Sequence, residues 1–212
     1  MLRYHTIPVT PLQQNSSIVW CDETMAGAVI DPGGEIARIR TAADRLGVRL
    51  EQILLTHAHI DHAGGAGALA HELKLPIVGP HPADQFWIDA LAQQSMMFGM
   101  PAAETFTPKR WLADGDTVRV GNCELAVRHC PGHTPGHVVF HCSQAQRAFV
   151  GDVLFAGSIG RSDLPGGDYD TLIASIVERL WPMGDDTVFI PGHGPESSFG
   201  RERRSNPFVG GT

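Results

Sequence analysis

The chain has 212 residues, of which 42% are hydrophobic and 18% charged, and its formal net charge is −7. This composition is typical of a globular protein, and the negative balance argues against general binding of nucleic acid. No apolar run approaches the roughly 20 residues of a membrane helix, and the opening residues contain no apolar signal segment. The cysteines show no pairing pattern, so we expect free thiols and a cytoplasmic protein; they are Cys21, Cys123, Cys130 and Cys142.

The first half of the chain alternates short apolar strands with helices. Strands are predicted at 2–8, 16–21 and 26–31, with a Pro-Gly-Gly turn after Asp31. Helical spacing predicts a helix over 36–46 that ends at Gly47, then a strand over 51–55, a helix over 65–73 and a strand over 76–79. The stretch 82–111 is rich in aromatic residues and methionine, and it is either a wall beside a substrate or a connecting helix packed on the core.

The second half repeats the same order. Strands are predicted at 117–120, 124–130, 137–142 and 148–151, followed by a helix over 168–181 that Pro182 ends and a last strand over 187–190. Strands followed by a helix in each half favour an α/β (α+β) architecture of αββα order, with two mixed sheets face to face and helices outside. No linker separates the halves, so we expect a single domain over residues 1–212.

A cluster of metal-ligand residue types follows the strand that ends at Leu55. The segment 57–62 reads HAHIDH, which places His57, His59, Asp61 and His62 within six residues. Neutral imidazole and carboxylate suit zinc and, with different selectivity, iron or manganese. Four ligands are more than one catalytic ion needs, because such an ion keeps a position open for water. The spacing therefore predicts two metals that share the cluster.

Three more residues of the same types follow later strands. His133 lies in the segment PGHTPGH, Asp152 follows the strand that ends at Gly151, and His193 lies in the segment PGHG. Each stands in a glycine- or proline-rich turn just past a short apolar strand, which is typical of a site built on the loops at one edge of a sheet. Cys130 precedes His133 by three residues, but its strand context favours a buried thiol over a ligand.

These seven positions, in this order and this strand-to-loop context, resemble the metallo-β-lactamase superfamily. Within it, the segments GDVLFAGSIGR at 151–161, DLPGGDY at 163–169 and GRERRSNP at 200–207 resemble the short bacterial form of glyoxalase II, a hydroxyacylglutathione hydrolase. The resemblance covers residues 2–207, so it implies the metallo-β-lactamase sandwich for nearly the whole chain. The further helical domain that long glyoxalase II enzymes carry after the last histidine is not expected here.

The resemblance also implies roles for the seven residues. His57, His59 and His133 would hold a first metal, Asp61, His62 and His193 a second, and Asp152 would bridge them, with Asp61 and Asp152 as the catalytic carboxylates. Two divalent ions, zinc foremost and iron or manganese otherwise, would activate a hydroxide as the nucleophile. A closed structural zinc site is the alternative, but such sites have four ligands and often use cysteine.

The implied reaction is hydrolysis of S-D-lactoylglutathione to D-lactate and glutathione, a step of methylglyoxal detoxification, by a monomer in the cytoplasm. Arg161 stands where glyoxalase II proteins hold the glycine carboxylate of glutathione with a basic residue. The tyrosine expected two positions later is replaced by Asp163. Three arginines near the C-terminus are candidates for the missing contacts, unless they form a solvated charge run; they are Arg201, Arg203 and Arg204.

Other readings of this family stay open. A persulfide dioxygenase with a single iron is the most serious competitor, and a metallo-hydrolase for another ester or lactone is a further one. A β-lactamase would usually be exported, and a nuclease of this fold would carry large insertions.

Thr56 and Thr134 either bond the neighbouring imidazoles or cap strand ends. The remaining histidines are expected to be ordinary surface or hydrogen-bonded groups; they are His5, His71, His81, His129, His137 and His141.

Overall fold

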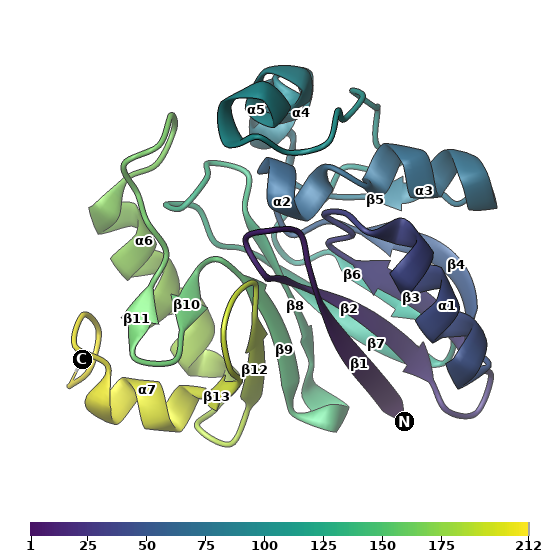
Figure 1. The fold of residues 1–212 in the computed structure, drawn as a ribbon. Coiled ribbons are helices and arrows are strands. Elements are labelled where there is room, and N and C mark those ends of the chain that lie inside the picture. Colours follow the sequence, from purple (N-terminus) through teal and green to yellow (C-terminus); the bar gives the residue numbers. More distant parts are fainter. Residues whose placement is uncertain (212) are drawn as a thin grey trace.

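The computed structural model describes residues 1–211 as two sheets packed face to face, with helices on both outer sides (Figure 1). The first sheet has five strands in the order β1-β2-β3-β4-β5. Its first three strands run antiparallel and its last three run parallel. The strands are β1 (Leu2–Val9), β2 (Gln14–Cys21), β3 (Ala26–Ile30), β4 (Arg49–Leu54) and β5 (Ile77–Val78).

The second sheet is also mixed, and its order is β13-β12-β9-β8-β7-β6. Strand β12 runs parallel to β9, whereas the other neighbours pair antiparallel. A separate small hairpin joins β10 (Leu154–Phe155) to β11 (Ser158–Ile159). The strands of the sheet are β6 (Thr117–Val120), β7 (Cys123–His129), β8 (Val138–Cys142), β9 (Arg147–Gly151), β12 (Val188–Pro191) and β13 (Ser197–Ser198).

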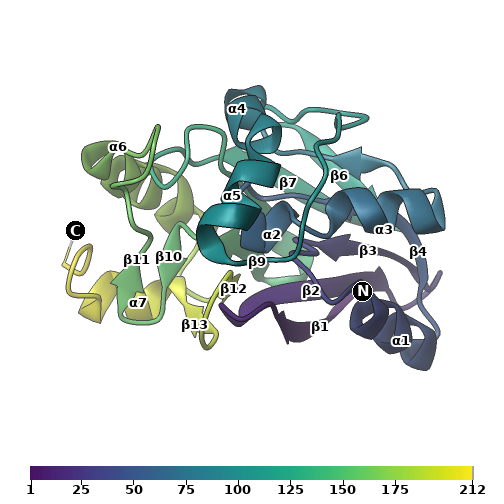
Figure 2. The same ribbon diagram turned by 45° about the horizontal axis from the view of Figure 1, so that its top comes forward.

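The helices cover the two outer faces and one end of the sandwich. In both views α1 and α3 lie on one outer side and α6 and α7 on the other, while α4 and α5 lie beside α2 (Figures 1 and 2). None of the described helices is both long and apolar enough to span a membrane. The helices are α1 (Ile36–Leu46), α2 (Ile60–Ala63), α3 (Ala66–Leu73), α4 (Gln85–Asp89), α5 (Leu91–Phe98), α6 (Tyr169–Ser175) and α7 (Phe199–Ser205).

Apolar side chains fill three layers of this architecture. Between the sheets, Leu54 of β4 packs with Phe140 of β8 and Phe149 of β9. A second layer fills the space between the first sheet and its helices, and a third layer does the same for the second sheet. Each fully buried large side chain contributes about 1.5–3 kcal/mol of transfer free energy, so the strands form a rigid support for the loops at their ends.

Most predicted elements are confirmed, and one predicted helix differs in its second half. Helix α1 has the predicted bounds and ends at Gly47, whose φ of 67° is easily reached without a side chain. The predicted helix 168–181 is α-helical only as far as Ser175 and continues as a π-helical stretch, so Pro182 lies in a final 3-10 turn. The predicted helix 65–73 is confirmed as α3, and the short helix α2, which begins at Ile60 inside the metal-ligand motif, was not predicted. Short elements such as β10, β11 and β13 were missed because two residues show no periodicity.

Candidate metal centre

The seven predicted ligand residues meet at one end of the sandwich. His57 and His59 follow β4, and Asp61 and His62 lie on α2. The others lie in the loop between β7 and β8, after β9 and after β12; they are His133, Asp152 and His193. The structure groups possible ligand atoms within 4.8 Å of one another in the two predicted triads, and it adds a third group that shares two of their histidines; the groups are His57/His59/His133, Asp61/His62/His193 and Asp31/His57/His62.

Asp152 lies between the two predicted triads. Its Oδ2 atom is 3.6 Å from His133 Nε2 and 3.6 Å from His193 Nε2. Its Oδ1 atom is 3.3 Å from His62 Nε2. Because a carboxylate has two oxygens, a side chain at this place could contact a metal ion bound to either triad.

Three imidazoles are held by their outer nitrogen. His62 Nδ1 pairs with Asp31 Oδ2 at 2.9 Å, His133 Nδ1 with the carbonyl oxygen of Arg161 at 2.7 Å, and His193 Nδ1 with that of Leu12 at 3.1 Å. A proton on Nδ1 satisfies each acceptor, and this tautomer leaves the lone pair of Nε2 facing the cluster. Metal-binding histidines in proteins are usually oriented in this way.

Thr56 orients His57 through a similar contact, as one of its two predicted roles requires. Thr56 Oγ1 lies 3.1 Å from His57 Nδ1 and donates to Asp31 Oδ2 at 2.6 Å. Asp31 thereby contacts one histidine of each triad, directly in the case of His62 and through a threonine in the case of His57. Thr134 does not bond an imidazole, since its hydroxyl donates to Asp84.

The unpartnered atoms of the cluster test whether a metal fits. Within residues 1–211, His57 Nε2, His59 Nε2, His62 Nε2 and Asp152 Oδ1 are buried without a hydrogen-bond partner. A buried polar atom left unsatisfied costs about 1–3 kcal/mol, so four of them in one place indicate a binding partner from outside the chain. Imidazole nitrogens together with carboxylate oxygens are the donor set of zinc, iron and manganese. The residues therefore fit a pair of divalent metal ions.

Burial and neighbouring charges shift the pKa values of the cluster residues in opposite directions. Burial lowers the pKa of His57 well below its usual value and that of His59 to about 3, so both imidazoles are neutral. Burial acts to raise the pKa of Asp152, but the adjacent His62 outweighs it and the net pKa is lowered. The carboxylates of Asp152 and Asp61 outweigh burial in raising the pKa of His62, which shows how much negative charge is concentrated here.

A cavity of about 310 Å³ opens onto the cluster. Within the stretch 82–111, Ile88 and Leu91 pack on the core, as one of its two alternative predictions expects, while Trp87 and Phe98 line this cavity. The cavity thus has an apolar wall opposite a polar floor. Its lining residues are Leu12, His59, Ile60, Asp61, Trp87, Gln94, Phe98, His133, Asp152, Arg161, Leu164 and His193.

Arg161 lies at the cavity, whereas the C-terminal arginines do not. The Arg161 guanidinium pairs with both oxygens of Asp163, at 2.7 and 2.8 Å, and its side chain is 56% exposed. On α7, Arg203 and Arg204 face Asp185 at 3.6 and 4.0 Å. Neither they nor Arg201 line the cavity. The idea that these three arginines replace missing glutathione contacts gains no support from their positions.

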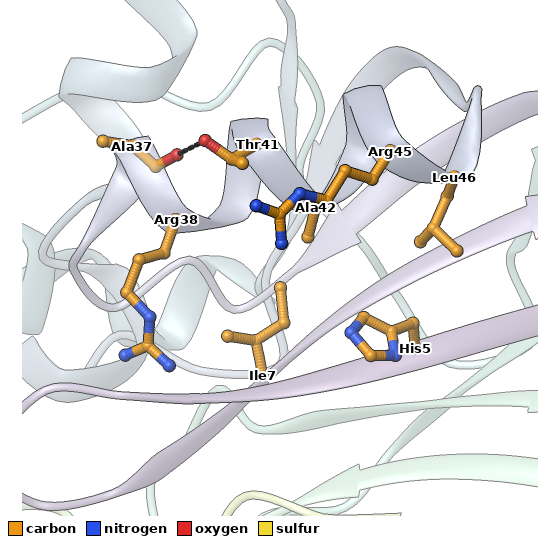
Figure 3. A pocket seen from close by; sticks show the side chains of 8 residues that line it. All are labelled: His5, Ile7, Ala37, Arg38, Thr41, Ala42, Arg45 and Leu46. Carbon is orange, nitrogen blue, oxygen red and sulfur yellow. Dashed lines mark hydrogen bonds between the residues drawn. The ribbon is translucent and has the colours of Figure 1, made fainter.

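A second hollow, between β1 and α1, has a volume of about 510 Å³ (Figure 3). Its lining carries the basic side chains Arg38 and Arg45 beside His5 and an apolar floor around Ile7. None of the three metal-ligand groups found among residues 1–211 reaches it. Although this hollow is larger, the chemistry of the chain is concentrated in the smaller cavity over the metal cluster.

His137 was predicted as an ordinary histidine but belongs to the centre. It is fully buried, its Nε2 accepts from the backbone N–H of Asp152 at 3.0 Å, and its ring stacks on His57 with centroids 4.6 Å apart. The one sequence signal was its position in PGHTPGH, four residues after His133. Cys130 is a buried free thiol, as predicted.

Gly192 leaves space that the cluster uses, and this gives a testable prediction. A Cβ atom at this position would lie 2.0 Å from Asp152 Oδ1 and 2.6 Å from His62 Cε1. We expect Gly192→Ala to displace Asp152 and to lower the bound metal to about one ion per chain or less, measured by elemental analysis. Gly67→Ala is the control, because its added Cβ meets only ordinary contacts at 3.6 Å. Full metal content in Gly192→Ala would contradict the prediction.

Comparisons with known proteins agree with this geometry. The family model of the metallo-beta-lactamase superfamily matches residues 9–193. The chain is 45% identical over 204 residues to the hydroxyacylglutathione hydrolase GloC of Haemophilus influenzae, with 96% of each chain covered. It is also 31% identical over 190 residues to the human mitochondrial persulfide dioxygenase ETHE1, covering 87% of this chain and 67% of that protein.

Two solved structures share the fold closely. The B3 metallo-beta-lactamase BLEG-1 superimposes with a TM-score of 0.91 at 34% identity, covering 99% of this chain and all of that chain. TTHA1623 in a di-iron-bound form superimposes with a TM-score of 0.88 at 37% identity, covering 97% of this chain and all of that chain. The predicted αββα sandwich is therefore confirmed.

Proposed function

Because this chain belongs to the metallo-beta-lactamase superfamily of metallo-hydrolases, we propose that it hydrolyses S-D-lactoylglutathione to D-lactate and glutathione. One observation carries the proposal. Two metal-ligand triads with Asp152 between them lie at a cavity that ligands of both triads line, and Arg161 is another of its lining residues. The similarity to the hydroxyacylglutathione hydrolase of Haemophilus influenzae supports the choice of substrate.

The residues around the cavity would have different roles in this hydrolysis. Two divalent ions, zinc or alternatively iron or manganese, supply Lewis acidity for the attacking water and the thioester carbonyl when bound. Asp61, a candidate ligand of the second triad, also lines the cavity, and its carboxylate would take the proton that the water releases. The leaving thiolate needs no acid from the protein, because a thiol pKa is only about 8.5. Trp87, Phe98 and Leu164 shield the reacting atoms from bulk water.

The direct test is thiol release from S-D-lactoylglutathione by the purified protein, with metal content quantified in the same sample. We expect rapid release that a chelator abolishes and that added metal restores. No release from a protein carrying two ions per chain would overturn the substrate, while the fold and the metal ligands would stand.

Arg161 is expected to bind a carboxylate of the glutathione moiety. Charge reversal by Arg161→Glu should raise KM by about 10-fold or more with little change in kcat, because it removes a charge-assisted contact made equally in ground and transition states. Metal content should not change, since the contact of Arg161 with His133 is made by its backbone oxygen. An unchanged KM would remove Arg161 from the site.

Two variants sharpen this test. Asp163 holds the guanidinium and its pKa is lowered to about 2 by that contact, so Asp163→Ala should free Arg161 and lower KM. Arg203→Glu is the control of equal charge, because Arg203 lies on α7 away from the cavity. A KM increase in Arg203→Glu as large as in Arg161→Glu would indicate a general electrostatic effect rather than a binding contact.

Persulfide dioxygenase is the second candidate, because a human enzyme of that name is 31% identical. The complete second triad of Asp61, His62 and His193 favours the hydrolase, since a single-iron enzyme does not require it. Oxygen consumption with glutathione persulfide separates the two reactions. If neither glutathione compound reacts, other esters, lactones and β-lactams are the next substrates, as the similarity to BLEG-1 suggests.

A further inference from the structure

The segment 82–100, which includes α4 and α5, lies beside α2 at the metal end of the molecule (Figure 2). Two polar side chains of this segment are almost completely buried, Asp84 at 0% exposure and Gln94 at 3%. Neither is one of the seven candidate ligands. Their side-chain hydrogen bonds run to backbone or hydroxyl groups in the two loops that carry the first triad, or to the segment itself.

Asp84 ties together the two loops that carry the first triad. Its Oδ2 accepts from the backbone N–H of Ala58 at 3.1 Å and from the hydroxyl of Thr134 at 2.9 Å. Its Oδ1 accepts from the backbone N–H of Gly136 at 2.6 Å. Ala58 stands between His57 and His59, and Thr134 follows His133. One carboxylate therefore links the loop after β4 to the loop before β8.

Gln94 fixes the backbone on both sides of His59. Its Oε1 accepts from the N–H of Ile60 at 3.0 Å, and its Nε2 donates to the carbonyl of Ala58 at 3.3 Å. The same Nε2 donates to the carbonyl of Trp87 at 2.8 Å, which fastens α5 to α4. The peptide groups flanking His59 are thus bonded to side chains from a separate segment of the chain.

Asp84 is packed closely against the loop that contains Gly136. A Cβ atom on Gly136 would lie 2.6 Å from both the backbone nitrogen and Oδ1 of Asp84. Burial raises the pKa of Asp84 to about 6, and its three donors oppose that effect. Without the carboxylate, each of these three buried donors would lose its acceptor.

We propose that Asp84 and Gln94 are positioning residues of the first triad, which hold His57, His59 and His133 in register before a metal binds. Residues on other elements hold two ligands of the second triad, since Asp31 bonds His62 and the Leu12 carbonyl bonds His193. Segment 82–100 therefore couples two properties, the shape of the cavity wall and the affinity of the first metal. The proposal concerns metal binding alone and does not depend on which substrate is hydrolysed.

The test measures each site separately in metal-free protein titrated with Co²⁺. A His193→Ala background leaves the first triad intact, and a His133→Ala background leaves the second intact. Asp84→Asn keeps the shape of the side chain but turns an amide NH₂ toward groups that are themselves donors. We expect it to weaken Co²⁺ affinity at the first site about 10–100-fold, the usual effect of mutating a residue that orients a metal ligand. Co²⁺ affinity at the second site should stay within a factor of about three.

Matched controls come from the same segment. Asp89→Asn changes an exposed carboxylate of α4 whose partner is the surface residue Gln85, so it should leave both affinities unchanged. Gln94→Leu should weaken the first site, and Gln94→Glu should recover part of the loss because it keeps the acceptor for Ile60. If Asp84→Asn does not fold, Thr134→Val removes one donor to Asp84, and Thr134→Ser restores it.

The outcomes separate positioning from a general structural role. Loss confined to the first site, with a similar melting temperature of the metal-free protein, supports the proposal. Wild-type first-site affinity in folded Asp84→Asn and Gln94→Leu would overturn it. Equal weakening of both sites would also overturn it, because that pattern indicates loosening of the whole metal end.

Discussion

Replacing Asp152 with alanine is expected to lower hydrolysis by about 1000-fold or more, and to reduce bound metal from two ions per chain to one or none. The reason lies in its position, with one oxygen 3.6 Å from an imidazole of each triad and the other 3.3 Å from His62. Without this carboxylate the cluster loses a side chain that lies between the two triads, and a shared negative charge would no longer reduce the repulsion between two bound cations.

The measurement combines the rate of thiol release with elemental analysis of the same preparation. Asp186→Ala serves as the control, because it removes an exposed aspartate in the turn before β12. Retained activity in Asp152→Ala would refute the bridging role. Lost activity with two ions still bound would assign Asp152 to the chemistry rather than to metal binding.

Asp31→Asn is expected to destabilise the metal-free protein by about 3 kcal/mol and to weaken metal binding at both triads. Asp31 is buried and accepts three hydrogen bonds, from the N–H and hydroxyl of Thr56 and from His62 Nδ1. An amide in its place presents an NH₂ to donors, so buried donors lose their acceptor at about 1–3 kcal/mol each. Asparagine is chosen because the φ of 51° at this position is poorly tolerated by alanine.

Urea unfolding of the metal-free proteins measures the free energy of unfolding. Metal-free protein is used because bound metal would add its own stabilisation. Asp44→Asn, on the exposed face of α1, is the control. The comparison with Asp84→Asn is informative because Asp31 contacts both triads and Asp84 only the first. If Asp31→Asn spared either site, Asp31 would not be the shared support that its contacts indicate.

The sequence alone was sufficient to predict the candidate ligands and the fold class. Metal chemistry restricts ligands to a few residue types, and each of the seven stands in a recognisable turn after an apolar strand. Helical spacing and strand patterns are likewise local, and they predicted the exact bounds of α1 and β6. These features depend on residues that are close together in the chain.

Apart from Thr56, only the tertiary structure identified the side chains that hold those ligands in place. Asp31 bonds Thr56 across 25 positions, and Asp84 bonds Gly136 across 52, so no local pattern marks either pair. The same holds for His137, which contacts Asp152 from the loop before β8, and for Arg203, which a charge count could not distinguish from Arg161. A metal ligand must be one of a few residue types, so a single sequence position can indicate it. The residue that orients the ligand is determined by packing between distant segments, and this packing exists only once the chain has folded.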